Sequence, residues 1–432
     1  MNMFFISPAY IDPGTGSMLF SILIGAAATG YFVFRALIIK LKMVFSGGSV
    51  KSDSGKNTYV IYCEGKQYIN VFSSILAEFE KRGTPLLYLT SVQDDAALNA
   101  GFSFVKAEYI GEGNRAFARL NLLSATVVLM TTPGLDVYQL KRSKMATHYA
   151  HILHATSDAT MYRLFGLDYF DSVLLTGDYQ AHDIRALETE RGITQKELVT
   201  VGCTYLDNAA KKMREIESTT EKKAHNFTVL VSPSWGASGL LTRYGEKLLS
   251  PLAKTGWRII VRPHPQSKKS ESEMLKKLEE LFSKNANVEW DYNSENIFSL
   301  AASDIMISDF SGIIYDYTFL CDKPVIYVNQ DLDLRPYDAD DLYEDIADER
   351  EKRQKLWQFS TLQKIGIELK EDFFDDIKNV IEKIADNAEL KAARKQAKSE
   401  AWFFQGEAAK HVANFMVEKA RVLDSASSEK QP

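Results

Sequence analysis

Short apolar runs alternate with amphipathic segments along most of the chain, and the alternation restarts after a polar stretch at 211–225. Apolar runs of this length are typical of buried strands. They lie at 58–62, 85–90, 102–109, 126–131, 172–176 and 198–201, and then at 227–232, 257–261, 288–291, 305–307 and 324–328. Strands that alternate with helices form mostly parallel sheets covered on both faces. We therefore expect two consecutive α/β domains, at 58–218 and 227–385.

The segments between these runs have the apolar spacing of helices. They are 69–81, 114–123, 181–190, 243–254, 272–282, 296–303 and 312–321. A helical segment is expected at 386–423, with one long helix over 390–423 that packs across both domains. The tail at 424–432 is expected to be disordered.

The amino-terminal residues have a different composition. No charged residue occurs between Asp12 and Arg35, and the apolar character continues past Arg35. A helix over 17–39 is long enough to cross a bilayer core, which needs about 20 residues. We therefore expect a membrane anchor at 1–45 and a flexible linker at 46–57. The alternatives are a signal peptide, whose basic amino-terminal region is missing here, and a buried helix of a soluble domain.

Positive charges follow the apolar interval and do not precede it, at Arg35, Lys40, Lys42, Lys51 and Lys56. Basic residues mark the cytoplasmic side of a spanning helix. We expect a single-pass protein of the cell (inner) membrane with its α/β domains in the cytoplasm. The chain has 51 Lys and Arg against 57 Asp and Glu, a net charge of -6, which argues against a general nucleic-acid binder.

A histidine between two prolines follows the strand expected at 257–261. Arg262 and His264 of this Arg-Pro-His-Pro motif therefore stand at a strand end, where α/β sheets bind ligands. The prolines restrict the backbone around the ring, and arginine offers a donor fork for phosphate. The motif predicts a binding site, with a structural turn as the alternative.

A second polar group stands where the strand at 305–307 runs into the helix at 312–321. It contains Ser308, Asp309, Ser311 and Gly312. Free backbone N–H groups and the helix dipole favour an anion at such a junction. Ordinary helix capping by Ser and Asp is the alternative. Ser234 and Trp235 follow another strand in the same way, and Trp235 is expected either to line a base or sugar pocket or to pack in the core.

Three histidines, His148, His151 and His154, are spaced by three residues. On a helix they would share one face and could bind a metal, but no carboxylate or cysteine completes a ligand set nearby. The segment is equally typical of a strand that ends at His154, and a histidine at a strand end suits a general base. We expect no metal site here. The acidic run at 338–341 has the form of a DxD metal motif, which we attribute to chance.

These motifs, in this order, resemble the CDP-glycerol glycerophosphotransferase family of the teichoic-acid polymerase and primase type. Arg262-Pro263-His264-Pro265 is similar to the family's Arg-Pro-His-Pro. The block from Ser308 to Gly312 is similar to its Ser/Thr-Asp-Tyr-Ser-Ser, and Ser234-Trp235 to its Thr-Trp. His154 and Thr156 match its Trp-His-Gly-Thr, although Leu153 and Ala155 depart from it.

The resemblance implies a GT-B fold, a CDP-glycerol donor bound mainly by the second domain and a lipid-linked acceptor at the membrane. It makes His154 and His264 the catalytic candidates, with no cofactor and Mg²⁺ dependence left open. The substrate and nucleotide contacts that it implies are Thr156, Ser234, Trp235, Arg262, Ser308, Asp309, Ser311 and Gly312. In this scheme an acceptor hydroxyl attacks the β-phosphate, His154 takes the hydroxyl proton and CMP leaves. The alternatives are a GT-B nucleotide-sugar glycosyltransferase and a non-catalytic, membrane-tethered scaffold.

Overall fold

The computed structural model describes residues 56–219, 226–293, 295–328, 332–384 and 387–428. The chain from Lys56 onward forms one compact unit. The anchor predicted at 1–45 and nearly all of the linker predicted at 46–57 lie outside the described residues. No helix among the described residues has both the length and the apolar character that a membrane span requires.

The first sheet has seven parallel strands in the order β3-β2-β1-β4-β5-β6-β7. They are β1 (Asn57–Cys63), β2 (Leu86–Thr90), β3 (Val105–Tyr109), β4 (Ala125–Met130), β5 (Ala146–Ile152), β6 (Ser172–Leu175) and β7 (Glu197–Thr200). The helical elements among them are η1 (Lys66–Tyr68), α2 (Ile69–Arg82), η2 (Ala96–Asn99), α3 (Asn114–Leu120), η3 (Ala159–Met161) and α4 (Tyr179–Glu190). The strand order turns between β1 and β4, so the carboxyl ends of these strands flank the crevice where such sheets bind ligands.

The second sheet has six parallel strands in the order β10-β9-β8-β11-β12-β13 and follows α5 (Thr204–Thr219). The strands are β8 (Thr228–Val231), β9 (Arg258–Val261), β10 (Val288–Trp290), β11 (Ile305–Ser308), β12 (Val325–Tyr327) and β13 (Gly366–Glu368). Its helices are α6 (Leu240–Ala253), α7 (Ser267–Ser270), α8 (Ser272–Phe282), α9 (Ile297–Ala302) and α10 (Ile313–Cys321), followed by α11 (Asp338–Leu342), α12 (Glu349–Lys355), α13 (Trp357–Ile365), η4 (Glu371–Phe373) and α14 (Ile377–Ile384). The prediction of two parallel α/β units is confirmed.

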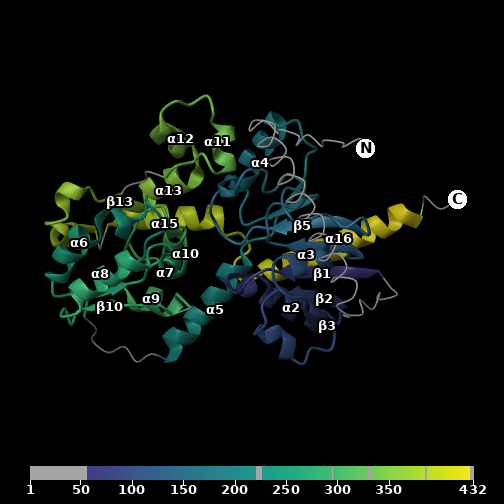
Figure 1. Ribbon diagram of the computed structural model, residues 1–432, viewed down its shortest axis with the longest axis horizontal. Coiled ribbons are helices and arrows are strands. Elements are labelled where there is room, and N and C mark those ends of the chain that lie inside the picture. Colours follow the sequence, from purple (N-terminus) through teal and green to yellow (C-terminus); the bar gives the residue numbers. More distant parts are fainter. Residues whose placement is uncertain (1–55, 220–225, 294, 329–331, 385–386, 429–432) are drawn as a thin grey trace, which may run out of the picture. The chain divides into compact units, whose positions relative to one another are not determined.

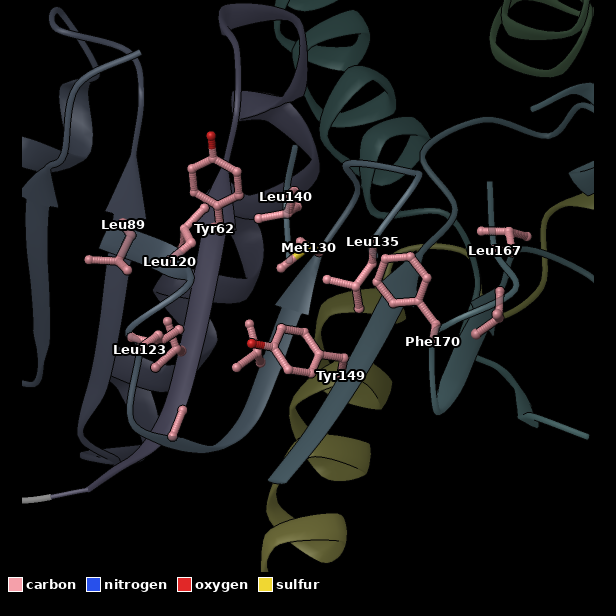
Figure 2. Close-up of a cluster of buried hydrophobic side chains, with 14 of the residues drawn as sticks. Tyr62, Leu89, Leu120, Leu123, Met130, Leu135, Leu140, Tyr149, Leu167 and Phe170 are labelled. Atoms are coloured by element: carbon pink, nitrogen blue, oxygen red, sulfur yellow. The ribbon is translucent and has the colours of Figure 1, made fainter. Parts of the chain in front are cut away.

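Both faces of the first sheet are buried. On one face Tyr62, Met130 and Tyr149, from three neighbouring strands, meet Leu135 and Phe170 from the loops (Figure 2). The other face packs against α2 and α16 (Ala408–Ser428), the last labelled helix in Figure 1. Strands buried on both faces consist of nearly continuous apolar residues, which is why they stand out in the sequence.

The long helix predicted over 390–423 is wrong, because the structure has two helices, α15 (Ala388–Ala401) and α16. Between them Gly406 has a φ of 82°, a left-handed backbone conformation that a continuous right-handed helix does not contain. The Asp207 carboxylate of α5 fixes the break by accepting hydrogen bonds from the Gly406 and Ala408 N–H groups and from the Trp402 indole. α15 packs on the second sheet's helices α10 and α13, and α16 packs on the first sheet. The segment therefore contacts both α/β domains, as predicted. α16 also extends to Ser428, into the tail predicted to be disordered.

Candidate active site

Polar residues after β8, β9 and β11 meet at one edge of the second sheet, because these three strands are neighbours and run parallel. The residues concerned lie at 232–239, 262–266 and 308–312. This is the edge where the two motifs of the second domain were predicted to form a site. The structure therefore brings the two motifs together. Some of their side chains form hydrogen bonds within the protein, and others lie at the outer part of the edge.

Asp309 is buried and joins the loops of this edge. Its carboxylate accepts hydrogen bonds from the Ser234 N–H and hydroxyl, both at 2.9 Å. It also accepts from the N–H groups of Leu240 (2.9 Å) and Ser311 (3.1 Å). Burial raises the pKa of this carboxyl despite those donors. Asp309 thus ties the loop after β8 to the start of α6 and to the loop before α10.

Ser308 and Arg262 are also turned toward the protein. The Ser308 hydroxyl is fully buried and donates to the Ser232 carbonyl at 2.6 Å. The Arg262 guanidinium donates to the Asp291 carboxylate and, at 2.7 Å, to the Asn293 carbonyl. The contacts of both residues, like those of Asp309, support the loops. Their predicted contacts with a substrate remain predictions.

His264 and Trp235 form the outer part of this edge. Their rings are stacked with centroids 6.3 Å apart, and Trp235 is 47% exposed, so it lies outside the core. The His264 Nδ1 accepts a hydrogen bond from the Gln266 N–H at 3.1 Å. A neutral His264 therefore carries its proton on Nε2, where it can donate to an anionic oxygen. Burial lowers the pKa of this ring, which favours the neutral form.

The start of α10 is open to a ligand. Gly312 at its amino terminus is exposed, and no side chain in the described part of the chain caps the helix. Neither Ser311 nor Asp309 caps α10 through its side chain. The Asp309 carboxylate accepts from the Ser311 N–H, which precedes the helix. Uncapped N–H groups at a helix start are suited to bind a phosphate.

A cavity of about 790 Å³ lies between α6 and α8, next to this edge. Arg243, Tyr244, Lys247 and Lys277 are among its lining residues. Glu271, which also lines it, accepts a hydrogen bond from the Gly236 N–H in the turn after Trp235. The volume is within the range of pockets that hold nucleotide-sized ligands.

In the first lobe, which is the domain built on the seven-stranded sheet, β5 ends two residues before His154. The His154 Nδ1 lies 2.9 Å from the Thr131 hydroxyl, at the end of β4, and 3.3 Å from the Tyr162 hydroxyl. The Tyr68 ring packs edge-on against it, with centroids 4.9 Å apart. Burial lowers the pKa of His154 to about 4, so the ring is neutral at pH 7.

A smaller cavity of about 130 Å³ adjoins His154. Its lining includes Tyr162, Ser157 and Asp158. Burial raises the pKa of the Asp158 carboxyl to about 7. The predicted contact Thr156 is buried next to this cavity, and its carbonyl accepts a hydrogen bond from the Tyr179 hydroxyl at 2.6 Å. Whether the Thr156 hydroxyl meets a substrate remains a prediction.

The other two histidines of the cluster do not join His154 in a metal site. β5 is a strand, so His148 and His151 lie on opposite faces of the sheet. His148 contacts the Ser172 hydroxyl at 2.8 Å, whereas His151 contacts Tyr162 and Phe170. Among the described residues no group of His, Cys, Asp or Glu side chains is arranged to hold a metal ion.

The sequence reasoning missed Tyr162, Thr131 and Asp158. Thr131 could have been found, because it follows the strand next to β5 and so ends at the same sheet edge. Tyr162 and Asp158 lie in the long loop after β5, where no periodic pattern marks them. The Asp158 carboxylate accepts hydrogen bonds from the Trp357 and Gln358 N–H groups at the start of α13, which links the two lobes.

The acidic run at 338–341 forms ion pairs. Asp338 and Asp341 each lie 2.7 Å from the Arg191 guanidinium, which also pairs with Asp168. Asp340 pairs with Lys352. These contacts explain the run without a metal, in agreement with the interpretation that its DxD form is due to chance.

Two parallel Rossmann-like sheets, each with polar side chains at a strand-end edge, define a GT-B-like fold. Residues 54–350 match the model of the CDP-glycerol:poly(glycerophosphate) glycerophosphotransferase family, and the chain belongs to this family. It is a CDP-glycerol glycerophosphotransferase-like transferase. The resemblance found in its motifs is thereby confirmed.

Solved structures with a similar fold include the wall teichoic acid polymerase TagF, in a variant soaked with CDPG. It is 14% identical, with a TM-score of 0.54 over 90% of this chain and 97% of that chain. UDP-GlcNAc 2-epimerase from Neisseria meningitidis, bound to UDP-GlcNAc, is 15% identical, with a TM-score of 0.51 over 84% of this chain and 100% of that one. The same enzyme from Methanocaldococcus jannaschii is 12% identical, with a TM-score of 0.54 over 84% and 100%. No curated protein matches the sequence.

Proposed function

We propose that this protein transfers glycerol phosphate, or a similar alditol phosphate, from a CDP-linked donor to a lipid-linked or polymeric acceptor in cell-surface polymer synthesis. The observation that carries the proposal is the edge formed by the ends of β8, β9 and β11. There His264, an exposed Trp235 and the uncapped start of α10 lie on one sheet edge of a chain that belongs to the glycerophosphotransferase family. These are the elements that a nucleoside diphosphate needs: donors for phosphate and an aromatic face for the nucleoside.

The proposed transfer has the following steps. The acceptor hydroxyl oxygen forms a bond to the β-phosphorus of the donor, and the bond from that phosphorus to the bridging oxygen breaks. CMP leaves with the bonding electron pair, and the hydroxyl proton passes to solvent water as the new bond forms. His264 Nε2–H and the first N–H groups of α10 would stabilise the charge that develops on the phosphate oxygens. The cavity beside His154 would admit the acceptor hydroxyl.

Release of CMP tests this reaction directly. We would incubate the detergent-purified full chain with CDP-glycerol and a membrane lipid extract, and compare it with a His264→Ala variant. Loss of one such donor is expected to lower kcat about 100-fold, equivalent to about 3 kcal/mol of barrier. Release of UDP or GDP from sugar nucleotides, with no CMP from CDP-alcohols, would favour a glycosyltransferase. A wild-type chain that turns over neither class would favour the scaffold.

Membrane anchoring is a separate part of the proposal. It is supported by the uncharged interval between Asp12 and Arg35 and by the basic residues that follow it. An anchor would keep the catalytic unit close to a lipid-linked acceptor and raise its effective concentration. The expected result is that the full chain stays in the membrane pellet after a carbonate wash. Recovery in the supernatant would contradict an integral anchor.

A further inference from the structure

His151, Tyr162 and His154 form a row of hydrogen-bonding groups beside the 130 Å³ cavity. The Tyr162 hydroxyl lies 3.0 Å from His151 Nε2 and 3.3 Å from His154 Nδ1. Burial lowers the pKa of His151 to about 3 and that of His154 to about 4. Both rings are therefore neutral at pH 7, and each carries a single proton on one of its two nitrogens.

The single proton of the Tyr162 hydroxyl couples the two rings. In the first arrangement the Tyr162 hydroxyl proton points to His151 Nε2. The Tyr162 oxygen can then accept a hydrogen bond from a proton on His154 Nδ1, which leaves His154 Nε2 unprotonated and able to act as a base. If His151 carries its proton on Nε2, that proton points to the Tyr162 oxygen. The hydroxyl proton is then free to point at His154 Nδ1, and a His154 ring that accepts it carries its own proton on Nε2.

The second nitrogen of His151 distinguishes these arrangements. His151 Nδ1 is buried and has no hydrogen-bond partner among the residues that the structure describes. In the first arrangement His151 Nε2 accepts a hydrogen bond, so the proton of the neutral ring is on Nδ1 and forms an unpaired N–H in the interior. The second leaves only an unpaired lone pair there. Orphaned buried N–H groups are rare, and unsatisfied buried acceptors are somewhat less so. The second arrangement is therefore favoured.

We propose that His154 acts as a neutral hydrogen-bond donor through Nε2–H to a phosphoryl oxygen of the substrate, and not as the base that takes the acceptor proton. Tyr162 and His151 hold it in this form and are positioning residues. The Thr131 hydroxyl, 2.9 Å from His154 Nδ1, can donate to the same lone pair. The inference rests on the proposed phosphoryl transfer and revises the role that the family resemblance implied for His154.

The chemistry agrees with this assignment. A base is most effective when its pKa is near the working pH, and burial makes His154 a much weaker base than that. A donor aimed at developing negative charge needs no proton transfer, and a neutral imidazole can supply it. Phosphoryl transfers through loose transition states depend mainly on positioning and charge stabilisation.

The tautomer can be observed without any activity. We would label the histidines of the full chain with ¹⁵N in detergent and assign His154 by the signals that a His154→Gln variant loses. The expected spectrum at pH 7 shows His154 Nε2 protonated and Nδ1 bare. His264 is an internal reference, because its Nδ1 faces a backbone N–H, which can only donate. A proton on His154 Nδ1 would overturn the proposal.

Two substitutions separate a donor from a base. The Gln side-chain amide can place an N–H near the position of Nε2 but cannot take a proton, whereas Glu can take a proton but cannot donate when ionised. We expect His154→Gln to retain CMP release within about 10-fold of wild type and His154→Glu to lose about 1,000-fold, a typical cost of losing such a donor. Equal losses, or a more active Glu variant, would contradict the donor role.

Tyr149→Phe is the matched control for Tyr162→Phe. Tyr149 is a buried tyrosine on β5 whose hydroxyl accepts from the Ser143 N–H and does not reach His154. We expect Tyr162→Phe to change the His154 ¹⁵N shifts and to lower kcat about 10-fold with an unchanged KM, the effect of about one lost hydrogen bond. Tyr149→Phe should change neither. A wild-type chain without CMP release would refute the proposed function, while the spectrum would still decide the tautomer.

Discussion

Asp158 connects the loop that carries His154 to the start of α13, and its protonation makes this connection depend on pH. Burial raises its pKa to about 7 from an ordinary value near 4, so between these values the folded protein binds a proton that the unfolded chain does not. The free energy of unfolding therefore falls as pH rises through this range. We expect the midpoint of thermal unfolding to decrease from pH 5 to pH 7.

The same measurement on two variants tests the assignment. Asp158→Asn should flatten the decrease, because the asparagine does not titrate. Burial also raises the pKa of the Asp316 carboxyl to about 7, so Asp316→Asn should flatten it too and the double variant most of all. An unchanged slope in the Asp158→Asn variant would show that Asp158 is ionised in the folded protein throughout this range.

At the site, the sequence indicated where the residues stand but not which way they point. A strand end can be located from an apolar run, so His264, Ser311 and His154 could be placed at strand ends. The direction of Asp309 depends on the loop after β8, 75 residues earlier, whose N–H groups it accepts from. Such long-range pairing has no local pattern. For the same reason nothing in the sequence joins Tyr162 to the two histidines.

At the scale of elements, the start of α10 allows stability and binding to be changed in opposite directions. A Cβ at Gly312 would meet no atom of the described residues within 4 Å, which leaves room for a side chain. Gly312 has a helical backbone, with φ -59° and ψ -19°, so an aspartate there would act through the helix dipole and not as a side-chain cap. Gly312→Asp should stabilise the helix by about 0.5 kcal/mol. It should also weaken CDP-glycerol binding about 10-fold or more, because a carboxylate repels the diphosphate at close range.

Gly312→Ala is the matched control, since it adds the Cβ without the charge. Its affinity should stay within about threefold of wild type, a difference of less than 1 kcal/mol. Thermal unfolding and titration calorimetry with CDP-glycerol measure the two effects. If Gly312→Asp bound the donor as well as Gly312→Ala does, the diphosphate could not lie at this helix start.

α16 is expected to stabilise the first sheet although it comes from the far end of the chain. Met416 is fully buried on this sheet, among side chains of α2 and the strands. Met416→Ala should lower the free energy of unfolding by about 2–5 kcal/mol, through lost burial and the cavity left behind. Val422→Ala on the same helix removes a side chain that is 49% exposed and should cost less than about 1 kcal/mol. Urea unfolding followed by circular dichroism would show the difference.

Elements with a buried, regular pattern were predictable, and those that depend on distant contacts were not. The strands of both sheets stand out as apolar runs, whereas β5 was ambiguous because His148 and His151 interrupt its apolar pattern. β13 has three residues and is recognisable only by its pairing with β12. The break before α16 needs Asp207, about 200 residues earlier, to accept the exposed N–H groups.

For the molecule as a whole, Arg191 is the clearest link between the first sheet's helices and α11. Its guanidinium, 9% exposed, contacts Asp168 of the first lobe and Asp338 and Asp341 of α11. Burial raises the pKa of Asp338 although the arginine opposes this, which shows how strongly the carboxylate depends on its partner. Asp338 also accepts the Phe165 N–H from the loop after β5.

Arg191→Met should therefore destabilise the protein more than the loss of a surface ion pair would. Removing one partner of a buried ion pair costs about 3–5 kcal/mol, because the remaining charge is left buried. We expect a loss of this order in urea unfolding, together with faster amide exchange in α11. Arg335→Met is the control, because Arg335 pairs with Asp333 in an exposed position and its substitution should change stability by less than about 1 kcal/mol.

The triple change Arg191→Met, Asp338→Asn and Asp341→Asn should recover part of the loss, since no unpaired carboxylate then remains in α11. Without such recovery, the cost would come from packing against Phe165, over which the guanidinium lies, and not from charge.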